Sequence, residues 1–175
     1  TLPTSLPPGV ATTPAIATRR SVTATITFDA AADPALAGSS LTVDLGPAVF
    51  VEYGSTTHDL GVPTVAIMTM RRPVATSRGA TLSQLESYLL AQPGLPPDLA
   101  QQIRLFGAPG TRLPVPIPPG AVETSTVIGG SRAIILSDPS EAASGVIWED
   151  GAGVIHTVAG LLDKQDVLSV AHQVG

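Results

Sequence analysis

The chain has no cysteine and few aromatic side chains. None of its 175 residues is Cys, and aromatic residues make up only 3% of the sequence. Without Cys, neither a disulfide framework nor a thiolate metal site can form. With so few rings, the core must be built mainly from Val, Leu, Ile and Ala, which agrees with a hydrophobic content of 43%.

Basic residues are also scarce, and this argues against polyanionic partners. Nine Lys and Arg against fourteen Asp and Glu give a net charge of −5. We expect no nucleic-acid partner, because binding to phosphate backbones depends on clustered positive charge. No polybasic segment favours adsorption to anionic lipid. The chain also lacks the run of about 18 apolar residues that a spanning helix needs, so we expect membrane contact only through an anchor upstream of Thr1.

Glycine and proline, in contrast, are abundant and predict short elements joined by turns. There are seventeen of each, which is typical of strand-rich rather than bundled helical domains. Residues 1–18 contain four Pro and several Thr, and this composition predicts an extended linker. The length of the remainder predicts one α+β domain over residues 19–175.

The last third of the chain predicts an antiparallel meander followed by one helix. Four β-like runs are separated by turn residues: Val122–Ile128, Ser131–Leu136, Gly145–Trp148 and Val154–Val158. The pair Gly129-Gly130 suits a tight hairpin turn, because glycine accepts positive φ without strain. Asp163 is the expected N-cap of the closing helix, and Asp166 adds negative charge in its first turn. The apolar face of that helix comprises Val167, Leu168, Val170, Ala171 and Val174.

Trp148 is the only tryptophan and is expected in the core. Strand alternation puts Val146 and Trp148 on one face, and His156 and Val158 on one face of the returning strand. We predict that Trp148 is buried under the closing helix. The alternative, that Trp148 is an aromatic wall for a ligand, stays open.

The first half of the chain predicts further strands of the same sheet. Residues 22–28 alternate, with Val22, Ala24, Ile26 and Phe28 expected to point inward. Leu41–Leu45, Ala48–Tyr53 and Val62–Met70 are the next predicted strands. The last of these is apolar on both faces and is expected to be central. We predict that 22–28, 62–70 and the meander share one sheet.

The middle of the chain predicts a helical hairpin. Thr81 and Gln84 have the spacing of a capping box, and Leu82, Leu85 and Leu89 form an apolar stripe after them. A second helix is expected near residues 98–106. Residues 113–119 then alternate Pro with aliphatic side chains, which suits either a protected edge strand or a docking strip for a partner.

No catalytic motif is found. The sequence contains no nucleophile elbow, phosphate loop, zinc helix or calcium loop. His58 and Asp59, with Ser55 and Glu52 nearby, match no metal-ligand spacing. The basic cluster Arg71, Arg72 and Arg78 suits either an anion site or solvated strand ends. We therefore predict a non-enzymatic protein with no catalytic, cofactor-binding or metal-binding residues.

Several pieces in their order resemble a bacterial envelope domain of unassigned function. This domain recurs in the extracytoplasmic parts of anti-sigma-factor-like and lipoprotein-carrier-like proteins. The matching region is 81–171, about half of the chain, and one departure is His156, where such domains often carry Tyr. The matching pieces are 95–100, 113–118, 146–148, the strand from Val154 to Gly160, and the helix through Ala171.

The resemblance implies a curved sheet, of the open half-barrel type, covered by the helical hairpin and the C-terminal helix. It implies an extracytoplasmic location and a role as a regulatory or interaction domain of a tethered envelope protein, acting through an envelope protein partner. The alternative is a carrier of a lipid or another apolar ligand. A carrier needs an apolar cavity of several hundred Å3. Small and flexible residues that suit such a lining are Ala24, Ala48, Ala66, Ala133, Met68 and Met70.

Overall fold

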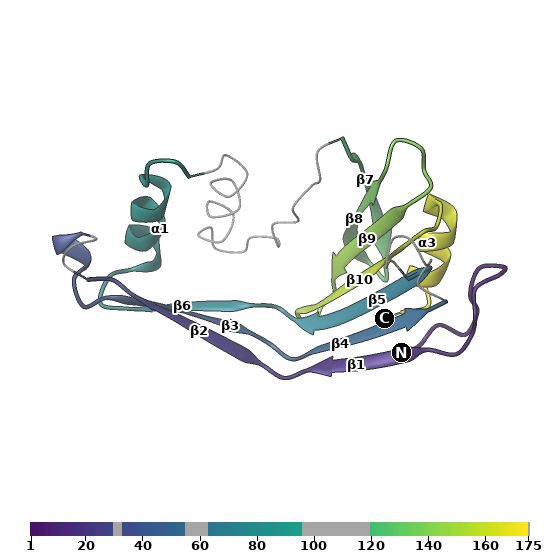
Figure 1. Cartoon of the computed structure of the whole chain (residues 1–175), viewed down its shortest axis with the longest axis horizontal. Coiled ribbons are helices and arrows are strands. Elements are labelled where there is room, and N and C mark those ends of the chain that lie inside the picture. Colours follow the sequence, from purple (N-terminus) through teal and green to yellow (C-terminus); the bar gives the residue numbers. More distant parts are fainter. Residues whose placement is uncertain (30–32, 55–62, 96–119, 175) are drawn as a thin grey trace. The chain divides into compact units, whose positions relative to one another are not determined.

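The computed structural model describes residues 1–29, 33–54, 63–95 and 120–174 (Figure 1). These residues form ten strands, two α-helices and one short 3-10 helix. The chain divides into two compact units. The first comprises Thr1–Ser21, Gly46–Arg72 and Ile117–Gly175, and the second comprises Val22–Leu45 and Pro73–Pro116.

The first unit is built on a seven-stranded sheet in which every neighbouring pair is antiparallel. The strand order is β1-β4-β5-β10-β9-β8-β7, so the predicted meander forms one side of the sheet as four neighbouring strands. The strand bounds are β1 Ala15–Arg19, β4 Ala48–Tyr53, β5 Val65–Arg71, β7 Val122–Ile128, β8 Ser131–Ser137, β9 Ser144–Glu149 and β10 Val154–Gly160.

Helix α3, Lys164–Ala171, covers one face of this sheet (Figure 1). It begins as predicted, because the Asp163 carboxylate accepts a hydrogen bond from the Asp166 N–H at 2.9 Å. Trp148 is 4% exposed and belongs to the same core cluster as the helix, so its predicted burial is confirmed. The core residues from both elements are Val51, Tyr53, Val65, Ile67, Ile128, Ala133, Ile135, Val146, Trp148, Val158, Leu162, Val167, Val170, Ala171 and Val174.

The second unit has a three-stranded sheet and, among its described residues, a smaller buried cluster. Strands β2 Val22–Thr27, β3 Ser40–Leu45 and β6 Val74–Arg78 lie in the order β2-β3-β6. Helix α1, Leu82–Leu90, begins with the predicted capping box of Thr81 and Gln84. The 3-10 helix η1, Pro34–Leu36, contributes Leu36 to a cluster with Phe28, Ala80 and Leu85. Of the side chains predicted to point inward from 22–28, only Phe28 is buried.

The prediction of a single sheet is wrong, because β2 and β5 belong to different sheets. Among the described residues, the chain leaves the first unit after Arg20-Ser21, returns to it at Gly46-Pro47, and leaves it again at Arg72-Pro73. Proline has no N–H to donate to a ladder, so Pro47 and Pro73 favour an interruption of pairing at two of these three points. The mostly antiparallel α+β class is confirmed.

The predicted linker over residues 1–18 is partly structured. Residues Ala15–Arg19 form β1, in which Ile16 pairs with Val51 of β4, so this part of the linker prediction is wrong. Pairing was not foreseen because this strand has no clear alternation of apolar and polar residues. The second predicted helix and the strip 113–119 lie outside the described residues. A single domain over 19–175 stays a prediction.

Candidate functional site

The face of the seven-stranded sheet opposite α3 carries apolar side chains on four neighbouring strands. We call it the open face and define it by two rows of half-buried residues in register across β5, β10, β9 and β8. None of these residues belongs to either buried core cluster. The first row is Ala66, Ala159, Gly145 and Leu136, and the second is Met68, Thr157, Ile147 and Ile134.

Three of the four first-row residues, Ala159, Gly145 and Leu136, line a depression. Gly145 lies between Ala159 and Leu136, and a Cβ added there would lie only 3.1 Å from the Ala159 Cβ. The depression has a volume of about 400 Å3 and is open to the surface. Pro139, Ala143 and Leu161 are among the other residues of its mostly apolar lining. Its size is in the range of small-ligand sites, although most such sites are more enclosed.

One polar atom on the open face has no partner. The Thr157 Oγ1 is buried and makes no hydrogen bond with any residue that the structure describes. Leaving a buried hydroxyl unpaired costs about 1–3 kcal/mol. Thr157 Oγ1 is therefore a polar atom of this face whose hydrogen-bonding capacity is unused by the described residues.

The residues expected to line a cavity are not all brought together. Ala66, Met68 and Met70 lie on the same face of β5, as alternation predicts. Ala133 instead belongs to the core beneath α3, and Ala24 lies on β2 of the other sheet. Ala48 is buried at 2% exposure, opposite Met70. Ala48 and Met70 are direct cross-strand neighbours and share the face of Ala66 and Met68, but only Ala66 and Met68 belong to the two rows that define the open face.

A second polar cluster centres on His156, on the face that packs against α3. The rings of His156 and Trp148 lie directly opposite each other on β10 and β9 and are stacked, with centroids 5.1 Å apart and an interplanar angle of 17°. On the other side of His156, the Thr69 Oγ1 lies 3.4 Å from Nδ1. The imidazole is 7% exposed, so it is part of the packed interior.

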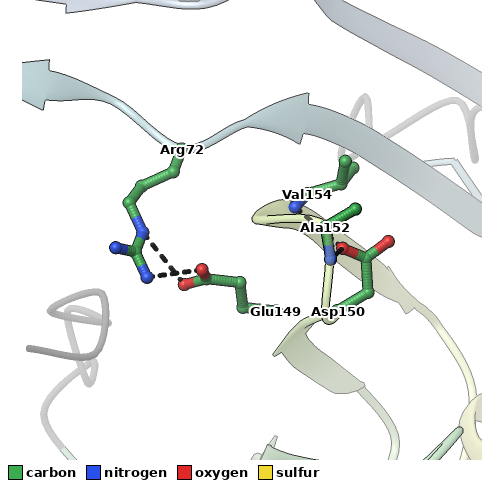
Figure 2. Close-up of polar contacts among 5 residues, drawn as sticks. All are labelled: Arg72, Glu149, Asp150, Ala152 and Val154. Carbon is green, nitrogen blue, oxygen red and sulfur yellow. Dashed lines mark hydrogen bonds and ion pairs between the residues drawn. The ribbon is translucent and has the colours of Figure 1, made fainter. Parts of the chain in front are cut away.

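Asp150 ties this imidazole to the β9–β10 turn. One carboxylate oxygen lies 3.1 Å from His156 Nε2. The other accepts hydrogen bonds from the N–H groups of Ala152 and Val154 at 2.9 Å each, as Figure 2 shows. The Val154 N–H and then the His156 ring are the main causes that lower the pKa of the Asp150 carboxyl below its ordinary value.

Thr69, His156 and Asp150 stand in the order of a nucleophile, a base and an orienting acid. However, the depression is lined by none of the three, and the imidazole is held by Trp148 within the core. The contacts explain how the β9–β10 hairpin is held together. Strand alternation predicted that His156 lies on a sheet face, but it did not predict these partners. Residues 148 and 156 are evenly spaced on either side of the Asp150–Gly153 turn, and this spacing would have predicted that Trp148 and His156 lie opposite each other.

The predicted basic cluster is divided between different environments. The Arg72 guanidinium forms a two-point ion pair with Glu149, with Nη2–Oε1 at 2.5 Å and Nε–Oε2 at 3.3 Å (Figure 2). Arg71 is exposed at the end of β5, and Arg78 ends β6 in the second unit. Arg72 is also exposed just past the end of β5, so the prediction of a solvated strand end holds for it, with the Glu149 ion pair in addition.

The histidine candidates do not assemble a metal site in the part of the chain that is described. Glu52 is exposed on β4, whereas Ser55, His58 and Asp59 lie outside the described residues. His172 is the C-cap residue of α3. No group of three or more His, Asp or Glu among the described residues could hold a metal ion. Over the same residues, no helix has the length and apolar character required to cross a membrane.

Comparison with protein-family models, with curated proteins and with solved structures gives no match for this chain.

Proposed function

We propose that this chain is a non-enzymatic, extracytoplasmic interaction domain of a bacterial envelope protein, and that its open face binds an apolar segment of a partner protein. The single observation that carries this proposal is the pair of half-buried, mainly apolar rows across β5, β10, β9 and β8. The resemblance to extracytoplasmic domains of anti-sigma-factor-like proteins supplies the location and the regulatory role.

The form of the open face favours a protein segment over an enclosed small ligand. Its eight residues extend over four strands, and the depression at one end is open. An apolar strand or helix could cover both rows at once, and its polar backbone or side chain could pair with Thr157 Oγ1.

The test is a charge placed on the open face. Met68→Lys puts an ammonium group in the second row, and the flexible Lys stem can carry it to solvent without unfolding the sheet. The matched control is Ile16→Lys on β1 of the same sheet, where the side chain is already 57% exposed. We expect a partner identified by its binding to the wild-type protein to lose affinity at least about tenfold only in Met68→Lys, since burying an unpaired charge is costly. Equal affinity in all three proteins would contradict the proposal.

A second candidate function, a carrier of a lipid or another apolar ligand, is favoured by the 400 Å3 depression with its mostly apolar lining. Leu136, Ala159 and Leu161 would contact acyl carbons there, and Thr157 lies one row away. This reading corresponds to the lipoprotein-carrier type of open half-barrel, which is the other class that the sequence resembles.

Native mass spectrometry decides between the two candidates. The protein is purified without detergent from its own host's envelope. An adduct of lipid mass that is lost on delipidation and regained on mixing with lipid would support the carrier function and contradict the interaction proposal. A protein that carries no such adduct would contradict the carrier function.

A further inference from the structure

The strand β7 forms one edge of the seven-stranded sheet and is unusually suited to further pairing. It pairs with β8 on one side, and no other described strand pairs with it. Its seven residues contain no proline and a single charge, Glu123. Edge strands normally avoid pairing with other chains through charges, prolines or bulges. The opposite edge, β1, follows this rule, since Pro14 precedes it and Arg19 and Arg20 close it.

The side chains of β7 reinforce this difference. Val122 and Val127 are 53% and 59% exposed, although β-branched apolar residues favour a paired strand. Glu123 makes no ion pair with a described residue. Across the ladder, Arg132 leans over β7 and donates a hydrogen bond from Nη2 to the Ser125 Oγ at 3.1 Å. The Glu123 carboxylate, which has no ion-pair partner among the described residues, and the Arg132 guanidinium, which is bonded only to the neutral Ser125 hydroxyl in this region, therefore lie on the same face of β7.

We infer that β7 pairs with the β7 of a second copy of this chain, antiparallel and centred on Ser125, so that the two seven-stranded sheets become one continuous sheet. In this register Ser125 lies opposite its own equivalent, and Glu123 lies opposite Val127 of the second copy. Such a two-fold contact is closed, because the same edge is used by both copies.

Charge complementarity selects a second copy over an arbitrary strand. Diagonal neighbours across an antiparallel pair are within reach of long side chains. Glu123 is then diagonal to Ser125 of the other copy. Since the Arg132 guanidinium of that copy is bonded to Ser125, it lies within reach of the Glu123 carboxylate and forms an ion pair with it. The two-fold symmetry produces a second, equivalent ion pair. On the other face of the ribbon, Thr124 lies opposite Thr126 of the second copy, and Thr–Thr pairs favour cross-strand hydrogen bonds.

The first test is sedimentation of the full chain over concentrations from about 1 µM to about 1 mM. Edge pairing buries less than the roughly 800 Å2 per partner of a standard interface, so we expect a reversible, weak dimer. Glu123→Arg should raise its dissociation constant at least about tenfold, because two attractive contacts become repulsive. Arg132→Glu should do the same. The double variant should return toward the wild-type value.

The control for charge is Glu52→Arg on β4, a strand that already has a partner on both sides and whose Glu52 is exposed. It should leave the dimer unchanged. A chain that stays monomeric up to about 1 mM would overturn the inference and leave β7 to strands of other proteins. A dimer that ignores both single charge reversals would overturn it as well, since it must use another surface.

The absence of cysteine allows an independent test of the register. Directly opposite residues of antiparallel strands have Cα atoms about 4.5–5.5 Å apart, which a disulfide can span. Ser125→Cys should therefore give a covalent dimer on mild oxidation. Ser169→Cys, at an exposed position on α3, should not. Equal cross-linking of the two variants would contradict a pairing centred on Ser125.

Discussion

Trp148 is the single residue whose truncation should destabilise the first unit most. It is 4% exposed, stacks on His156 and packs in the cluster beneath α3. We expect Trp148→Ala to lower the free energy of unfolding by about 3–5 kcal/mol, through lost burial and the cavity that remains. Urea denaturation measures this, with Ile26→Ala, at a 54% exposed position, as a control expected to stay within about 0.5 kcal/mol. Similar midpoints for both variants would show that the tryptophan is not a core residue.

Asp150 makes the stability of the β9–β10 hairpin depend on pH. Hydrogen bonds from the Val154 N–H and from His156 lower the pKa of this carboxyl in the folded protein. A lowered pKa means that the stabilisation is present above the ordinary value of about 3.9 and is lost as the pH falls through the folded value.

Asp150→Asn removes the charge but keeps an oxygen that can accept from the Ala152 and Val154 N–H groups. The variant should therefore be less stable than the wild type at neutral pH, and the difference between their denaturation midpoints should shrink below about pH 4. Asp138, whose pKa is lowered mainly by the Ser140 hydroxyl, is present in both proteins, so its effect cancels. A gap of the same size at neutral and acidic pH would mean that the Asp150 charge contributes nothing.

At the scale of elements, Gly160 allows β10 and β5 to approach. A Cβ added there would lie 2.0 Å from the Thr64 carbonyl oxygen, which is backbone and cannot rotate away. We expect Gly160→Ala to cost about 1–3 kcal/mol as the strands are forced apart. The control is Gly151→Ala, where nothing lies within 4 Å of the added Cβ. Thermal unfolding of the two variants distinguishes a local clash from a general intolerance of alanine in place of glycine.

Local signals predicted the elements well, since they act within a few residues of the chain. The glycines of the β7–β8 turn both have positive φ, as the hairpin prediction requires. The Thr81 capping box and the Asp163 N-cap lie where the spacing placed them. Strand β1 and strand β6 were missed, because short, mostly exposed strands have no apolar alternation to reveal them.

At the scale of the whole molecule, the sequence could not assign strands to sheets. The alternation in β2 predicted a buried face, yet Val22 and Ile26 are 46% and 54% exposed. Alternation predicts that one face of a strand is apolar and the other polar. It does not predict which strands pair with that strand, because pairing depends on contacts with residues distant in the sequence. Alternation predicted that Ala66, Met68 and Met70 share one face of β5. The pairing of β5 with β10 that completes the open face depends on residues about ninety positions apart.

The two units should differ in their protection from hydrogen exchange. Among the described residues, the buried cluster of the first unit has fifteen members and that of the second has four. Fewer buried apolar contacts imply a lower free energy of local opening. We expect amides of β9 and β10 to exchange much more slowly than those of β2 and β3. Equal protection would show that both units open together in one cooperative step.

The most direct measurement for the proposed function is photo-cross-linking from the open face in the native envelope. A photoreactive amino acid is placed at Met68 in one protein and at Ser169, exposed on α3, in a control. We expect a discrete protein adduct from position 68 that the control does not form. An adduct of lipid mass, or equal labelling from both positions, would contradict the binding of a protein segment by the open face.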